Sequence, residues 1–103
     1  MARIDAVVQR VLLQSARERL TKLQALNAPE VLIAAQQAKV NGDGGLSKVG
    51  HLAEFGKLEV SGEPQPREYR RGWGLEFTVT DGSRVWLIPG PYGLFLTDRQ
   101  GNQ

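Results

Sequence analysis

Residues 73–88 read WGLEFTVTDGSRVWLI, and this stretch decides the fold. Apolar residues alternate with small or polar ones over 73–80, which is the period of a half-buried β-strand. Asp81-Gly82 is a strong hairpin signal, and a second apolar run at 84–88 follows it. The stretch therefore predicts two antiparallel strands that are joined by a tight turn.

The length of that turn decides which side chains are buried. A two-residue turn pairs Phe77 with Trp86, whereas a three-residue turn over 80–82 pairs Phe77 with Val85. A slip of one residue exchanges the two faces of a strand, so only one of these registers can be correct. We prefer the three-residue turn, because it separates apolar from polar side chains and places Trp86 beside Arg84 on the face opposite the core. The apolar face then consists of Leu75, Phe77, Val79, Val85 and Leu87.

Shorter segments on either side complete the predicted sheet. After the hairpin, Pro89-Gly90-Pro91 indicates a turn, and residues 93–97 form a further strand. Before it, Leu58 and Val60 alternate as a short strand. The two prolines of 62–66 indicate an irregular loop, because proline removes a backbone donor and restricts its predecessor.

The N-terminal part of the chain has the pattern of helices. Residues 2–26 contain no Gly or Pro, and their apolar residues recur at spacings of three and four. A second helix is predicted from Pro29 to Val40, with Asn27 as its N-terminal cap. Gly42 is expected to end that helix in a left-handed conformation. The two helices therefore form an antiparallel hairpin.

These elements predict one α+β domain that spans residues 1–103. Residues 1–56 are mainly helical and include a short third helix at 46–55. Residues 57–98 form a three- or four-stranded antiparallel sheet, on which the N-terminal helical hairpin is expected to pack. A polar tail follows at 99–103.

Composition excludes several classes of function. The 103 residues are 41% hydrophobic and 23% charged, as in an ordinary globular domain. There is no cysteine and one histidine, His51, which excludes disulfides, thiolate metal sites and multi-histidine metal sites. No apolar run approaches the ~20 residues of a membrane span, and no signal-peptide pattern begins the chain. We expect a soluble, cytoplasmic protein without cofactor, metal or membrane partner.

No spacing of residues indicates catalysis. The glycine-rich segment 41–50 lacks the Gly-Lys-Ser/Thr order of a phosphate-binding loop, and Leu52 stands where a calcium loop needs Glu. His51 and Glu54 are spaced to form a general-base pair, yet no nucleophile accompanies them. We therefore expect that the protein is not an enzyme.

The helices favour a protein-interaction or regulatory module that associates with a second copy or with another protein. On a helical wheel, the apolar residues in the first half of helix 2–26 centre roughly 100° from those in its second half. One half can thus pack on its own domain while the other contacts a partner. The residues predicted to bind that partner are Val7, Val8, Val11 and Leu12.

A nucleic-acid-binding protein is the alternative hypothesis. The segment around 67–74 interleaves arginines with aromatic residues, and the preferred hairpin register adds two more residues to the same surface. Arginines bind phosphates and aromatic rings stack on bases, so the mixture suits single-stranded nucleic acid. The formal net charge of +2 is small, so the placement of the charges has to carry this hypothesis. The residues predicted to bind are Arg67, Tyr69, Arg70, Arg71, Arg84 and Trp86.

Overall fold

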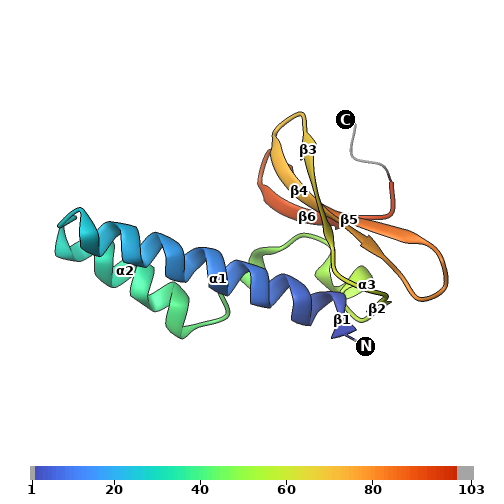
Figure 1. Cartoon of the computed structure of the whole chain (residues 1–103), viewed down its shortest axis with the longest axis horizontal. Coiled ribbons are helices and arrows are strands. Elements are labelled where there is room, and N and C mark those ends of the chain that lie inside the picture. Colours follow the sequence, from blue (N-terminus) through green and yellow to red (C-terminus); the bar gives the residue numbers. More distant parts are fainter. Residues whose placement is uncertain (1, 100–103) are drawn as a thin grey trace. The chain divides into compact units, whose positions relative to one another are not determined.

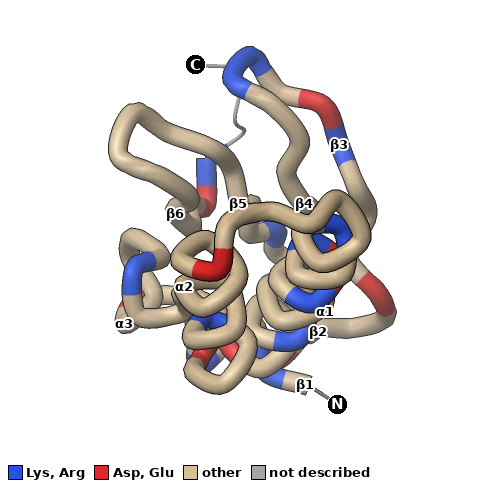
Figure 2. Tube along the Cα trace, turned by 90° about the vertical axis from the view of Figure 1, so that its left-hand side faces the viewer, with Lys and Arg blue, Asp and Glu red and all other residues tan. Residues whose placement is uncertain are grey.

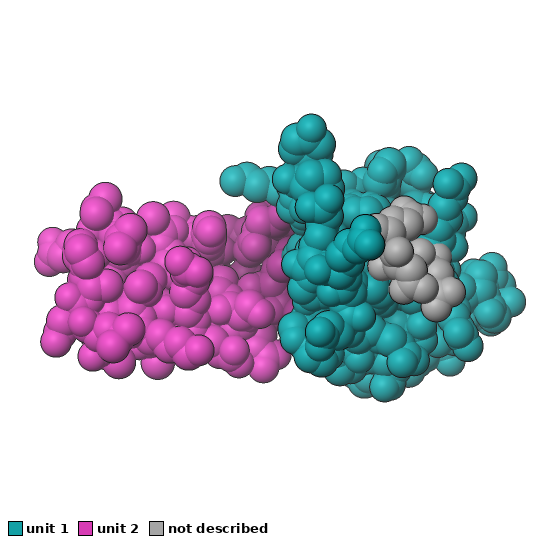
Figure 3. All heavy atoms as spheres, turned by 90° about the horizontal axis from the view of Figure 1, so that it is seen from above, with its two compact units in different colours: residues 1–7, 48–103 teal, residues 8–47 magenta. Residues whose placement is uncertain are grey.

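The computed structural model describes residues 2–99 and has the predicted α+β fold (Figure 1). Within those residues, two long N-terminal helices precede a short third helix and a four-stranded antiparallel sheet. The chain divides into two compact units (Figure 3). The sheet unit contains the described residues up to Val7 and from Lys48 onward, and the helical unit contains Val8–Ser47. The predicted tail at 99–103 lies outside the described residues from position 100 onward.

The helical unit contains the predicted hairpin of helices. Helix α1 spans Ile4–Ala25, of which the part from Val8 onward belongs to this unit, and α2 spans Glu30–Asn41. The side chain of Gln36 is almost fully buried, and its amide Nε2 donates to the backbone oxygen of Ala16 at 2.9 Å. This hydrogen bond joins α2 to α1, and it satisfies a polar group that would be costly to bury alone.

Asn27 ends α1 and does not cap α2, contrary to the prediction. Its φ of +52° is left-handed, a conformation that Asn tolerates better than most residues. The Asn27 N–H donates to the oxygen of Gln24 at 3.1 Å, and the Ala28 N–H donates to that of Leu23 at 3.0 Å. This pair of bonds is a Schellman motif, which closes the C-terminus of a helix. Pro29 precedes α2 and makes no side-chain cap.

The end of α2 also differs from the prediction. Gly42 has a φ of −99°, so it is not left-handed, and the first left-handed residue is Gly44 at +70°. The carboxylate of Asp43 accepts the backbone N–H groups of Gly45 at 2.9 Å and Ser47 at 3.1 Å. These hydrogen bonds hold the pKa of Asp43 below its ordinary value of 3.8, and the bond from Gly45 has the largest effect. The side chain of Asp43 therefore holds the conformation of this glycine-rich loop.

The sheet unit is built around an antiparallel meander in the order β3-β4-β5-β6. Its strands are β3 (Gln65–Tyr69), β4 (Gly72–Thr78), β5 (Arg84–Gly90) and β6 (Gly93–Thr97). A separate pair of short strands consists of β1 (Ala2–Arg3) and β2 (Glu59–Val60). Val60 also bridges to Val79, just beyond the end of β4.

Strand β3 was not predicted, because its prolines indicated a loop. Pro66 lies within the strand and pairs with Leu75 of β4. At the edge of a sheet a missing N–H costs no ladder hydrogen bond when it faces away from the neighbouring strand. The prediction of irregular structure over 62–66 is therefore wrong for Gln65 and Pro66.

The preferred register of the central hairpin is confirmed. Phe77 pairs with Val85, and the turn places Gly82 at a φ of +94°. The buried side chains of this face form the core of the sheet unit, and they include Phe77, Val85, Leu87 and Leu96. Trp86 lies on the other face, as predicted, but it is buried there together with Ile88, so the core is not confined to one face of the sheet.

The predicted helix at 46–55 is broken into a 3₁₀ turn at Leu46–Lys48 and a short α3 at Leu52–Phe55. The break occurs because Gly50 joins the edge of β6: its N–H donates to the oxygen of Leu94 at 3.0 Å, and its own oxygen accepts the N–H of Leu96 at 2.9 Å. A Cβ atom at Gly50 would lie 2.9 Å from Cβ of Phe95. Only glycine allows this close approach.

The helices were also compared with the requirements of a membrane span. None of those that the structure describes is long and apolar enough to cross a bilayer.

We predict that Asn27→Val destabilises the protein by about 1–2 kcal/mol, because a β-branched residue is strained at a left-handed φ. Asn27→Gly is the matched control, since glycine adopts this conformation without strain. Chemical denaturation followed by circular dichroism measures both. Equal stability of the valine variant and the wild type would contradict the left-handed end of α1.

Candidate functional site

The four residues predicted for self-association all lie on α1, but they do not form an exposed apolar surface. Val7 and Val8 are buried, with exposed fractions of 5% and 0%. Val11 and Leu12 are half-buried, and a Cβ atom at Gly44 would lie 3.2 Å from Cβ of Leu12. Much of this apolar surface is therefore already covered within the chain.

The six residues of the nucleic-acid hypothesis separate into two groups. The first group is Arg67, Arg84 and Trp86, which share Glu76 as a partner. The indole Nε1 of Trp86 donates to Glu76 Oε2 at 3.0 Å, and Nη2 of Arg67 donates to Glu76 Oε1 at 3.3 Å. Arg84 adds a second positive charge near this carboxylate, after that of Arg67. The Trp86 side chain is 9% exposed, so its ring does not offer a free face for stacking.

These contacts affect the charge of Glu76. Its side chain is 13% exposed, and burial acts to raise its pKa. The hydrogen bonds from Trp86 and Arg67, with the charges of Arg67 and Arg84, outweigh burial and lower the pKa below 4.5. The carboxylate therefore stays ionised at neutral pH and neutralises much of the positive charge on this part of the sheet.

Tyr69 lies between the two groups. Its ring covers Gly74, where a Cβ atom would lie 2.9 Å from Cε2 of the ring. Its hydroxyl oxygen is buried and has no hydrogen-bond partner among the described residues. Burial, with the nearby charge of Glu76, raises the pKa of Tyr69 above 10.0. The ring thus packs on the sheet and forms a fixed wall beside the second group.

The second group is the pair Arg70 and Arg71. They form the two-residue turn between β3 and β4, since Tyr69 pairs with Gly72. Figure 2 shows basic residues at the tip of this hairpin. Both arginines are exposed, and within residues 2–99 neither has a carboxylate partner. Gly72, with a φ of +136°, takes the conformation that the turn requires, so the arginines are not strained.

A second turn lies at the same end of the sheet. Strand β5 continues to Gly90, past the predicted turn at Pro89-Gly90-Pro91, and the chain reverses at Pro91-Tyr92. The side chain of Tyr92 is fully exposed. A Cβ atom at Gly90 would lie 2.7 Å from Cε1 of Phe95, so a glycine is needed where the Phe95 ring packs. The ring of Tyr92 in the turn is therefore free, whereas that of Phe95, three residues later on β6, is packed.

Two hollows open at this end of the sheet, and they share part of their lining. The smaller, of ≈ 190 Å³, has Arg70 and Arg71 in its lining, and the larger, of ≈ 370 Å³, has Lys48, His51 and Tyr92. We call them together the arginine–aromatic groove. Residues that line both hollows are Gly90, Pro91 and Phe95.

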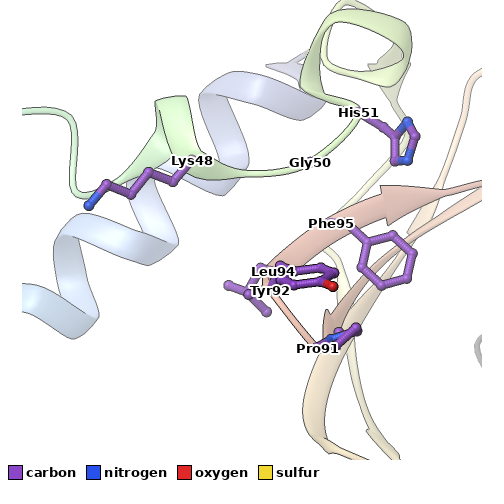
Figure 4. Close-up of a pocket in the computed structure, with 9 residues that line it drawn as sticks. Lys48, Gly50, His51, Pro91, Tyr92, Leu94 and Phe95 are labelled. Carbon is purple, nitrogen blue, oxygen red and sulfur yellow. The ribbon is translucent and has the colours of Figure 1, made fainter.

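Figure 4 shows how the larger hollow is arranged. The rings of His51 and Phe95 approach edge to face, with centroids 6.3 Å apart at 67°. His51 is held by Glu54, whose Oε1 lies 2.9 Å from its Nδ1. Lys48 also lines this hollow, and its side chain extends away from the rings. Among the described residues that line either hollow, none is acidic.

The arrangement has chemical limits. Over the described part of the chain, no group of three His, Cys, Asp or Glu side chains is placed to hold a metal ion. The groove offers cations, aromatic rings and backbone, which bind and orient a ligand.

The sequence pattern assigned Tyr92 to a turn and Phe95 to a strand, so neither was predicted as a site residue. The available signal was an aromatic residue inside a Pro/Gly turn, where a side chain has nothing to pack on.

We predict that Glu76→Gln changes the dependence of stability on pH. A group whose pKa is lowered by folding stabilises the fold above its unfolded pKa, and this contribution is lost as the pH falls through the folded value. The wild type therefore loses stability as the pH falls below 4.5, and the variant lacks that part of the loss.

Urea unfolding at a series of pH values measures this difference. Glu68→Gln, which removes an exposed carboxylate from the neighbouring strand, is the matched control. Parallel profiles for Glu76→Gln and the wild type would show that the Glu76 cluster is not formed.

The chain was compared with protein-family models, with curated proteins and with solved structures, and none of them matches it. The geometry of the groove therefore carries the functional argument by itself.

Proposed function

We propose that this chain is a non-catalytic, cytoplasmic protein that binds nucleic acid in the arginine–aromatic groove. The observation that carries the proposal is the grouping of Arg70, Arg71 and Lys48 with exposed aromatic surface around hollows without acidic lining among the described residues. Guanidinium and ammonium groups bind phosphates, while aromatic faces stack on bases of any sequence. Of the residues predicted to bind, the proposal keeps Tyr69, Arg70 and Arg71 at the groove.

The small number of cations sets the strength of this binding. Three phosphate contacts give a slope of roughly −2 for log K against log salt with a single strand. The interaction is therefore modest and depends on local charge rather than on the formal net charge of +2. Arg67 and Arg84 contribute little, because Glu76 lies between them and neutralises part of their field.

We predict that Arg70→Ala/Arg71→Ala weakens binding of a fluorescently labelled oligonucleotide about tenfold or more at low salt. Loss of two phosphate contacts also lowers the salt slope by roughly 1.4. Neither position has a positive φ, so alanine does not strain the turn. Fluorescence anisotropy at several salt concentrations measures both quantities.

The matched control is Arg17→Ala/Arg19→Ala, which removes the same charge from exposed positions on α1. This control is expected to bind within about twofold of the wild type, because neither arginine lines the groove. Equal losses in both double variants would contradict the groove and indicate nonspecific attraction.

The second candidate function is association with a second copy through the helical hairpin. Three large apolar side chains of the helical unit are exposed: Leu26 by 78%, Val31 by 74% and Leu32 by 51%. They lie at and beside the connection between α1 and α2. This observation moves the proposed interface away from Val7 and Val8, because those two side chains are buried.

We predict that Val31→Glu lowers the fraction of dimer at a given protein concentration, because a charge would be desolvated in an apolar contact. Gln24→Glu places the same charge at an exposed polar position of α1 and serves as control. Sedimentation velocity over a range of concentrations measures the mass. A monomeric wild type at every concentration would rule this function out.

A further inference from the structure

We propose that the larger hollow of the groove seats an unpaired nucleobase, so that the protein binds single-stranded nucleic acid and discriminates against duplex. This inference rests on the proposed function and adds the form of the ligand to it. The hollow of ≈ 370 Å³ is lined largely by rings, proline and glycine, and the side chain of Lys48, also in its lining, extends away from the rings. Such a lining suits a flat, weakly polar group better than a phosphate.

The rings are positioned for stacking before any ligand arrives. Phe95 is held where both Gly50 and Gly90 approach it, since a Cβ atom at either glycine would come within 3.0 Å of its side chain. His51 stands edge to face with Phe95 and is fixed by Glu54. Fixed rings lose little entropy on binding, so more of the stacking energy appears as affinity.

Tyr92 supplies the free face. Its side chain is fully exposed at the tip of the β5–β6 turn, although it lines the hollow. Exposure of a large ring costs solvation free energy, and a stacked base would cover that surface. A base inside a duplex is already stacked on both faces, so it cannot present one to Tyr92.

The phosphates of the same strand would bind at the smaller hollow. Arg70 and Arg71 line the smaller hollow, which shares Gly90, Pro91 and Phe95 with the larger one. A strand that seats one base beside Tyr92 can therefore run its backbone past the arginine turn. An acidic peptide would satisfy the arginines but would leave the aromatic hollow unfilled.

The test compares three labelled ligands of equal length: oligothymidine, its abasic counterpart and the corresponding duplex. The abasic strand keeps the phosphates and removes the bases. We expect oligothymidine to bind about 5- to 150-fold more tightly than the abasic strand, which is the range for one stacked base. The duplex is expected to bind no better than the abasic strand.

Variants of Tyr92 locate the effect. Tyr92→Leu is expected to lose most of the preference for oligothymidine over the abasic strand while binding the abasic strand as the wild type does. Tyr92→Phe keeps the ring and is expected to keep the preference. Unchanged abasic binding also shows that each variant is folded.

Two outcomes separate this inference from the proposed function. In the first outcome, oligothymidine, abasic strand and duplex bind equally, and their affinity falls with salt and depends on Arg70 and Arg71. The proposal that the larger hollow binds a base is then wrong, whereas the nucleic-acid function stands. If none of them binds at low salt, both proposals fall.

Discussion

The pairing of Phe77 with Val85 is the constraint on which the sheet unit depends. A turn of one residue fewer would have exchanged the faces of β5 and put Trp86 into the core in place of Val85 and Leu87. In the observed register, Trp86 reaches Glu76 on the other face, and that carboxylate also holds Arg67.

Sequence alone predicted those parts of the fold in which local pattern and packing agree. The helices of the hairpin and the register of the central strands belong to this class. Features that depend on contacts distant in sequence were missed: Gly50 breaks a helix because it bonds to β6, and Pro66 enters a strand because that strand is an edge. Asn27 was assigned to the wrong helix, since Asn serves equally well at either kind of terminus.

The candidate site was predicted only in part, for a related reason. Alternation places Glu76 and Trp86 on one face of the hairpin. It does not show that Glu76 also binds Arg67, because Arg67 lies on a strand that was not predicted. The groove arises because two hairpin turns meet at one end of the sheet, beside the segment that carries Gly50. No spacing in the sequence predicts that residues 48–51, 69–71 and 90–95 line neighbouring hollows. As a result, exposed basic side chains and aromatic rings line the same end of the sheet.

The central claim is that ligand contacts gather at this end of the sheet. Amide chemical-shift mapping by NMR, during addition of a short oligothymidine at low salt, tests it most directly. The account predicts that the largest shifts fall on Lys48, His51, Arg70, Arg71 and the turn at 90–95, with small shifts on α2. Shifts confined to α1 and α2, or uniformly small shifts across the chain, would contradict it.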